Sequence, residues 1–141
     1  MRIWVLNGPN LGQLGRREPG VYGTATYTEL VEEIAHVADE LAVTVDVRQT
    51  DDEATMLGWL HAASSEADAV VINPAAWTHT SVALRDAAAT LTVPFVEVHL
   101  SNPLAREEFR HTSYTAGLAR GIVAGFGVDS YLLAIRALVS A

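Results

Sequence analysis

Short apolar segments alternate along this chain with segments that have the periodicity of helices. The apolar segments occupy residues 3–6, 43–47, 69–72, 94–98 and 121–127. The helical segments occupy residues 24–41, a stretch beginning at 51 or 52, 81–90 and 130–139. This alternation is typical of a parallel sheet with helices on both faces. We therefore predict an α/β fold with a flavodoxin-like, doubly wound, five-stranded parallel sheet, built as a single domain over residues 1–141.

The first helical segment illustrates the pattern. Its apolar residues recur at gaps of four, three and four, which places them on one helical face; they are Leu30, Ile34, Val37 and Leu41. Either Thr26 or Thr28 is suited to cap this helix, and either Asp51 or Asp52 to cap the next.

All nine basic residues are arginine, and the chain contains neither lysine nor cysteine. Without lysine, no side chain can form a Schiff base with a carbonyl substrate, so a reaction at a ketone would have to pass through an enol or enolate. Without cysteine, disulfides, thiolate nucleophiles and cysteine metal sites are excluded. The formal net charge of −8 argues against nucleic acid or an anionic membrane as the main partner.

No apolar run approaches the roughly 18 residues of a membrane span. Because the chain enters a strand at once, we expect no signal peptide and a cytoplasmic protein. The histidines lack the spacing of known metal motifs, so we expect no metal site; they are His36, His61, His79, His99 and His111.

Polar residues gather after the first, third and fourth predicted strands. In a parallel sheet these loops share one edge, where open α/β sheets bind ligands. The candidate site residues there are Asn10, Arg17, Tyr22, Asn73, Trp77, His79, Glu97, His99, Ser101, Asn102 and Arg110. A cation near Tyr22 would favour its phenolate, the form that acts as a general base. Glu97 and His99 share a strand face, so the carboxylate would orient the imidazole of a candidate general acid.

Ordinary structural explanations stay open for these candidates. The loop around Tyr22 can be a surface loop with solvated arginines, and His99 can be a structural histidine at a strand end. His79 and Asp86 are seven residues apart and would share a helix face, either in a site or with His79 as a cap and Asp86 in solvent. The first loop lacks the spacing of a phosphate cradle, and the chain lacks the serine elbow of α/β-hydrolases.

Six motifs in a fixed order cover nearly the whole chain. They are NGPNLGQLGRREPGVYG at 7–23, RQTDDE at 48–53, INPAAWTHTSVALRDA at 72–87, EVHLSN at 97–102, REEFRHTSY at 106–114 and GIVAGFGVDSY at 121–131. In order and spacing they resemble the type II 3-dehydroquinate dehydratases. The resemblance implies elimination of water from 3-dehydroquinate to 3-dehydroshikimate through an enolate, in the shikimate or the quinate pathway. It also implies no metal, no cofactor and a homododecamer of four trimers.

The resemblance further implies a role for each catalytic residue. Tyr22 would remove the proton next to the ketone, with Arg17 stabilising its phenolate. Asn10 would help to hold the enolate oxygen through a water molecule. His99 would protonate the departing hydroxyl, with Glu97 orienting its ring.

Substrate binding is implied for a second group of residues. It comprises Asn73, His79, Asp86, Arg110 and the backbone N–H groups of Leu100 and Ser101, which would take the substrate carboxylate. Asp86 would reach across a trimer interface. The loop that bears Arg17 and Tyr22 would close as a lid.

The chain departs from the family pattern at two positions. Thr112 stands where histidine is usual and Ser130 where glycine is common; neither has an implied role, so we expect effects on local packing. Two other functions remain as alternatives, a flavodoxin-like binding module for a nucleotide or FMN and a catalytically silent relative. The first loop argues against phosphate binding, and the joint presence of Arg17, Tyr22 and His99 argues against a silent protein.

Overall fold

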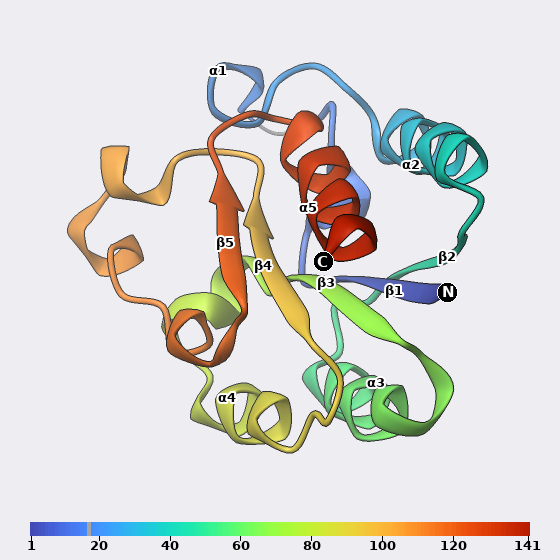
Figure 1. Cartoon of the computed structure of the whole chain (residues 1–141). Coiled ribbons are helices and arrows are strands. Elements are labelled where there is room, and N and C mark those ends of the chain that lie inside the picture. The colour runs from blue at the N-terminus through green and yellow to red at the C-terminus, as the bar shows by residue number, and fades with distance from the viewer. Residues whose placement is uncertain (17) are drawn as a thin grey trace.

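The computed structural model describes residues 1–16 and 18–141. Its five strands form one parallel sheet in the order β2-β1-β3-β4-β5 (Figure 1). The strands are β1 (Arg2–Asn7), β2 (Thr44–Gln49), β3 (Ala69–Asn73), β4 (Phe95–His99) and β5 (Gly121–Ala124). The predicted five-stranded parallel sheet is thus confirmed.

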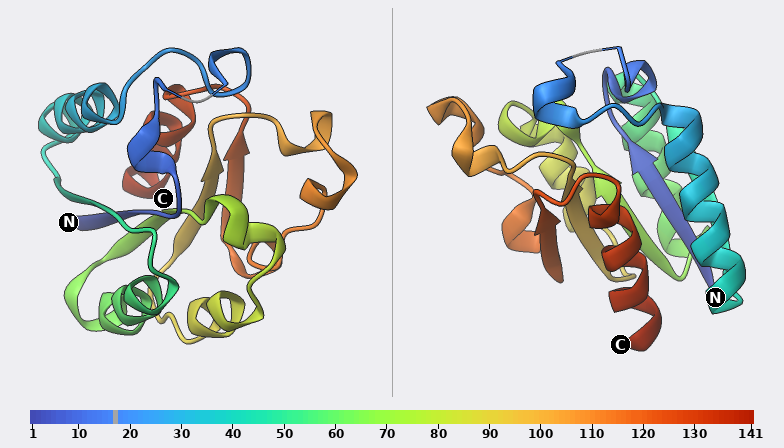
Figure 2. Two further views of the ribbon diagram at one scale, coloured as in Figure 1. Left: turned by 180° about the vertical axis from the view of Figure 1, so that it is seen from behind. Right: turned by 90° about the horizontal axis from the view of Figure 1, so that it is seen from above.

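Helices cover both faces of this sheet, as predicted. They are α2 (Tyr27–Leu41), α3 (Glu53–Glu66), α4 (Val82–Ala89) and α5 (Asp129–Ser140), with a short α1 (Pro19–Tyr22) in the first loop. One apolar core lies between the sheet and the pair α2 and α5, and a second lies between the sheet and the pair α3 and α4 (Figures 1 and 2). Within the described residues, no helix has the length and apolar character needed to cross a membrane.

Side-chain caps fix where three of the helices begin. Thr26 rather than Thr28 caps α2, where its hydroxyl accepts the N–H of Glu29 at 3.1 Å. This cap delays the helix to Tyr27, three residues after the predicted start. Asp52 rather than Asp51 caps α3. Ser81 caps α4, so this helix begins immediately after the polar loop that follows β3.

The fifth strand is shorter than predicted. It ends at Ala124, whereas the sequence pattern suggested an end at residue 127. Gly125 and Gly127 take φ values of +93° and +62°, in the left-handed region that favours glycine, and turn the chain toward α5. Their N–H groups donate to the carbonyls of His99 and Leu100, which ties this turn to the end of β4.

The loops after β1 and β3 lie in close contact at the carboxyl edge of the sheet. The N–H of Gly8, after β1, donates to the carbonyl of Asn73 at the end of β3 over 2.9 Å. A Cβ on Gly8 would lie 2.6 Å from the carbonyl oxygen of Pro74, closer than non-bonded atoms pack. Only glycine therefore allows these loops to meet. The strand register also places Asn7 directly beside Asn73.

Candidate active site

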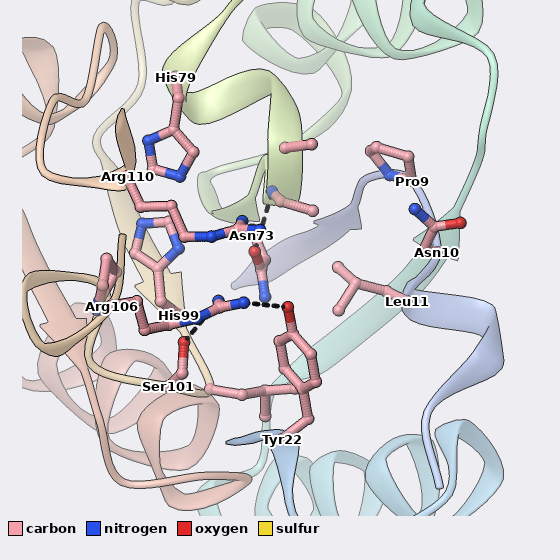
Figure 3. Close-up of a pocket in the computed structure, with 14 residues that line it drawn as sticks. Pro9, Asn10, Leu11, Tyr22, Asn73, His79, His99, Ser101, Arg106 and Arg110 are labelled. Atoms are coloured by element: carbon pink, nitrogen blue, oxygen red, sulfur yellow. Dashed lines mark hydrogen bonds between the residues drawn. The ribbon is translucent and has the colours of Figure 1, made fainter. Parts of the chain in front are cut away.

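The carboxyl ends of the central strands open into a cavity of about 240 Å³ (Figure 3). Its walls come from the loops after β1, β3 and β4 together with α1. Eight residues predicted for the site line it, namely Asn10, Tyr22, Asn73, His79, His99, Leu100, Ser101 and Arg110. Residues far apart in the sequence thus share one concave surface at the edge where open α/β sheets bind ligands.

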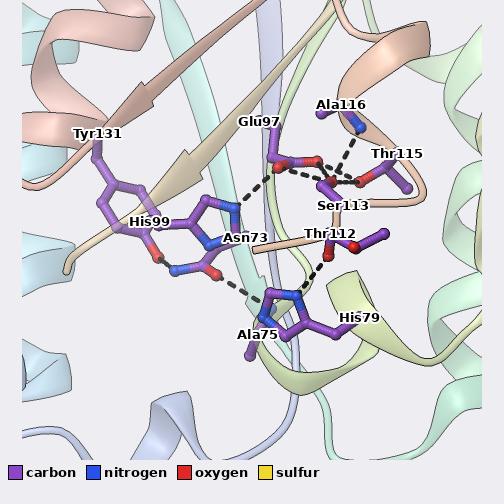
Figure 4. Close-up of polar contacts among 10 residues, drawn as sticks. All are labelled: Asn73, Ala75, His79, Glu97, His99, Thr112, Ser113, Thr115, Ala116 and Tyr131. Carbon is purple, nitrogen blue, oxygen red and sulfur yellow. Dashed lines mark hydrogen bonds and ion pairs between the residues drawn. The ribbon is translucent and has the colours of Figure 1, made fainter. Parts of the chain in front are cut away.

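Glu97 lies behind His99, on the side away from the cavity. The two residues are two positions apart on β4 and share one face of the strand, and His99 Nε2 donates to Glu97 Oε2 at 2.9 Å (Figure 4). Because the carboxylate accepts this hydrogen bond, the proton of a neutral His99 ring sits on Nε2. The cavity side of the ring then presents Nδ1, which can carry a proton only when the ring is an imidazolium.

Glu97 is anchored by hydroxyl groups from the loop after β4. Ser113 donates to both carboxylate oxygens, at 2.9 and 3.0 Å, and Thr115 donates a further, shorter hydrogen bond (Figure 4). Glu97 itself is buried. Burial alone would raise the pKa of Glu97, but the hydrogen bonds from His99, Thr115 and Ser113 together hold it below its usual range. The carboxylate is therefore ionised beside the imidazole.

This lowered pKa makes a prediction about stability and pH. A carboxyl group whose pKa is lower in the folded chain stabilises the fold fully above its unfolded pKa, near 4.5, and loses this contribution as pH falls through the folded pKa. We expect the free energy of unfolding of Glu97→Gln to fall furthest below wild type at about pH 6. The difference should shrink below about pH 4.5 and can be measured by urea unfolding at a series of pH values.

Glu40→Gln is the matched control for this series. Glu40 is exposed, and the pKa of its carboxyl is lowered by hydrogen bonding to Arg136. Because solvent and salt screen such a pair, its difference from wild type should be small and should vanish in about 0.5 M salt. A Glu97→Gln difference that stays constant with pH would contradict the ionised state assigned to Glu97.

Tyr22 meets an arginine that sequence analysis did not single out. Arg106 Nη2 donates to the Tyr22 hydroxyl at 2.8 Å, and Nη1 of the same guanidinium donates to Ser101 Oγ at 3.2 Å (Figure 3). Its charged centre lies 5.0 Å from the centroid of the Tyr22 ring. The predicted partner, Arg17, lies outside the described residues. Arg106 belongs to the same REEFRHTSY segment as Arg110, but no signal in the sequence placed it beside Tyr22.

Asn10 is held at the rim of the cavity by its backbone. It has φ of +68°, a left-handed conformation that asparagine tolerates better than most residues. Its N–H donates to Asp51 Oδ1 at 2.8 Å, and Gln49 Nε2 donates to the same oxygen at 3.1 Å. This leaves the Asn10 side chain beside the cavity, where Figure 3 shows it opposite His99.

His79 and Asp86 do not share a helix face as predicted. His79 ends the 3-10 turn η2 (Ala75–His79), and the cap Ser81 separates it from α4. His79 lines the cavity and donates from Nδ1 to the carbonyl of Thr112 at 2.7 Å (Figure 4). Burial lowers the pKa of His79, and the Thr112 carbonyl offsets part of this effect. Asp86 is exposed on α4, away from the cavity lining, with its carboxylate 3.1 Å from Arg85.

Two other loop residues also lie outside the cavity lining. Trp77 packs against the core between the sheet and the pair α3 and α4. The Asn102 side chain caps the 3-10 turn η3 (Pro103–Ala105) by accepting the N–H of Leu104 at 3.1 Å. Among the described residues, no three His, Asp or Glu side chains are grouped as metal ligands.

Comparison with known proteins decides the family. The sequence profile of the dehydroquinase class II family matches residues 1–139. The chain belongs to the class II dehydroquinase family. The predicted family and its enzyme class, a hydro-lyase, are therefore confirmed.

Relatives of this dehydroquinase resemble it along almost their whole length. The 3-dehydroquinate dehydratase of Salinispora tropica is 56% identical over 99% of this chain and 98% of its own. That of Mycobacteroides abscessus is 57% identical over 99% and 97% of the two chains. The type II dehydroquinase structure from Propionibacterium acnes has a TM-score of 0.96 at 49% identity, covering 99% of this chain and 97% of that one.

The two departures of this dehydroquinase from the family pattern are accommodated locally. Thr112 acts through its backbone carbonyl, which any residue would supply to His79. Ser130 is buried, and its hydroxyl accepts the N–H of Phe126 at 3.0 Å in the turn before α5. Glycine could not make that hydrogen bond, so Ser130 adds a contact to the turn.

Proposed function

We propose that this dehydroquinase removes water from 3-dehydroquinate to give 3-dehydroshikimate through an enolate intermediate. The observation that carries the proposal is the pairing of Tyr22 with Arg106 at 2.8 Å in the same cavity as a histidine backed by a buried carboxylate. An elimination next to a ketone needs a base for a carbon acid and an acid for a departing hydroxyl. The cavity offers a phenol and an imidazole for these two tasks.

Tyr22 acts as the base in the first step. Its phenolate takes the proton from the carbon next to the ketone, and the electron pair moves onto the ketone oxygen to form the enolate. Arg106 donates to the phenol oxygen and stabilises its charged form. We assign Arg17 the same task on the family resemblance. Asn10, at the cavity rim, helps to hold the enolate oxygen through a water molecule.

His99 acts as the acid in the second step. The enolate re-forms the ketone and a carbon–carbon double bond as the carbon–oxygen bond breaks, and the departing hydroxyl takes the Nδ1 proton as water. The imidazolium is held through Nε2 by ionised Glu97. The carboxylate thus fixes the ring and supplies the opposite charge that an imidazolium needs in a buried setting.

The remaining lining residues bind the substrate. The backbone N–H groups of Leu100 and Ser101 take its carboxylate, and Asn73, His79 and Arg110 bind its polar groups. Asp86 is exposed and outside the cavity of its own chain. We therefore propose that it completes the cavity of a neighbouring copy within a trimer, four of which form a homododecamer. Light scattering on the native protein measures the mass of this assembly.

The chemistry proposed here uses side chains and needs no metal or cofactor. The absence of lysine from the chain supports an enolate route, because no side chain can form an imine with the ketone. Arginine, tyrosine and histidine supply the charge stabilisation and the two proton transfers.

A direct assay tests the reaction. When 3-dehydroquinate is added to the purified protein, we expect the ultraviolet absorbance of a conjugated enone to rise. The rise should persist in excess chelator, because no metal takes part in the proposed steps. Folded, oligomeric protein that produced no rise would contradict the proposed reaction while leaving the family and fold unchanged.

A further inference from the structure

A buried phenol beneath the cavity takes no part in the steps above. Tyr131 on α5 is fully buried. Its hydroxyl receives a hydrogen bond from Asn73 Nδ2 at 2.8 Å, as Figure 4 shows, and donates one to Asn7 Oδ1 at 2.7 Å. Asn7 and Asn73 are also buried and end the adjacent strands β1 and β3. The phenol therefore ties the two central strands together directly below the site.

The direction of each hydrogen bond is fixed by chemistry. The amide nitrogen of Asn73 can only donate and the amide oxygen of Asn7 can only accept, so the phenol must be protonated to serve both. Burial raises the pKa of Tyr131 far above its usual range, and the hydrogen bond from Asn73 offsets only part of this. Tyr131 is therefore a permanent donor to Asn7 and acceptor from Asn73.

These contacts leave Asn73 a single orientation. Its Oδ1 accepts the N–H of Ala75 at 3.1 Å, and one N–H of Nδ2 goes to Tyr131 (Figure 4). A flipped amide would set N–H against N–H at Ala75, which leaves a buried donor unsatisfied. One N–H of Nδ2 then remains for the cavity that Asn73 lines.

We propose that Tyr131 is a positioning residue, which fixes the Asn73 amide so that its free N–H points at an oxygen of the bound substrate. Tyr131 is not among the residues that line the cavity and acts through Asn73. The inference rests on the proposed function, because it takes 3-dehydroquinate as the ligand.

Tyr131→Phe tests the inference because it keeps the ring and removes only the hydroxyl. The amide N–H binds substrate and transition state alike, so its misplacement should raise KM about tenfold and change kcat by less than about threefold. Tyr114→Phe is the matched control. Tyr114 is an exposed phenol outside the cavity lining, so loss of its hydroxyl should leave KM unchanged. An unchanged KM in Tyr131→Phe would overturn the inference.

A double-mutant cycle separates positioning from general packing. In an Asn73→Ala background the amide is gone, so Tyr131→Phe should raise KM no further. If Tyr131 acted only by stabilising α5, the two increases in KM would multiply instead. Multiplicative increases would therefore overturn the positioning role.

A crystal structure of Tyr131→Phe gives a readout that does not depend on turnover. We expect the Asn73 side chain to be rotated or divided between two conformers. An unchanged, single conformer would overturn the inference even for a protein inactive on 3-dehydroquinate. Failure of the wild-type protein to convert 3-dehydroquinate would instead overturn the proposed function, and the Asn73 conformation would still decide the role of Tyr131.

Discussion

Tyr22→Phe is expected to lower kcat on 3-dehydroquinate by roughly 10²–10⁴-fold, the usual contribution of a general base, which is about 3–5 kcal/mol of transition-state stabilisation. The substitution keeps the ring in the cavity wall and removes the atom that takes the proton. KM should change little, because the lost interaction is made in the transition state and not in the bound substrate. Steady-state kinetics with the enone assay measures both constants.

Tyr114→Phe provides the matched control for this substitution. Tyr114 lies in the loop after β4, its side chain is partly exposed, and it is not one of the residues lining the cavity. Its loss of a hydroxyl should leave kcat and KM at wild-type values. Near-normal turnover in Tyr22→Phe would mean that another group removes the proton.

Arg106→Met tests how the base is activated. This variant retains the phenol but removes the guanidinium that donates to it at 2.8 Å. Its turnover should fall near neutral pH and recover as pH rises, because loss of the Arg106 guanidinium makes the phenol harder to ionise and a higher pH restores its phenolate. Tyr22→Phe has no phenol to ionise and should show no such recovery. Parallel pH profiles of the two variants would contradict the pairing of Arg106 with the base.

Local patterns predicted most of the fold. Helical spacing identified the buried face of α2, and the period of two along β4 identified the contact of Glu97 with His99. The sequence left two candidate capping residues for α2 and two for α3. The choice of Thr26 and Asp52 depends on the backbone geometry at those residues. The length of β5 was overestimated. Its valine and alanine residues favour an extended strand, but Gly125 turns the chain.

Contacts between distant segments could not be predicted in this way. Arg106 and Tyr22 are 84 residues apart, and Asn73 and Tyr131 are 58 apart. Sequence periodicity reports the face of one element, whereas these pairs depend on how loops and a helix pack around the end of the sheet. Asp86 shows the same limit, because it is exposed in one chain and the role proposed for it depends on a second copy.

His99→Ala should separate the two halves of the reaction. With the acid removed, we expect formation of product to fall by roughly 10²–10⁴-fold. Proton removal should continue, because Tyr22 and Arg106 remain in place. In D₂O the enolate would then return to 3-dehydroquinate and carry deuterium at the carbon next to the ketone. Mass spectrometry of the recovered substrate, corrected for exchange without protein, measures this return against the appearance of product.

The ratio of exchange to elimination distinguishes the acid from the base. It should rise strongly in His99→Ala, whereas Tyr22→Phe should lower exchange and elimination together. Glu97→Gln is the intermediate case, since it keeps the imidazole but removes the charge that supports its protonated form, so its ratio should lie between wild type and His99→Ala. If His99→Ala lost exchange as completely as elimination, His99 would be acting before the enolate forms, and the assignment of separate acid and base would be wrong.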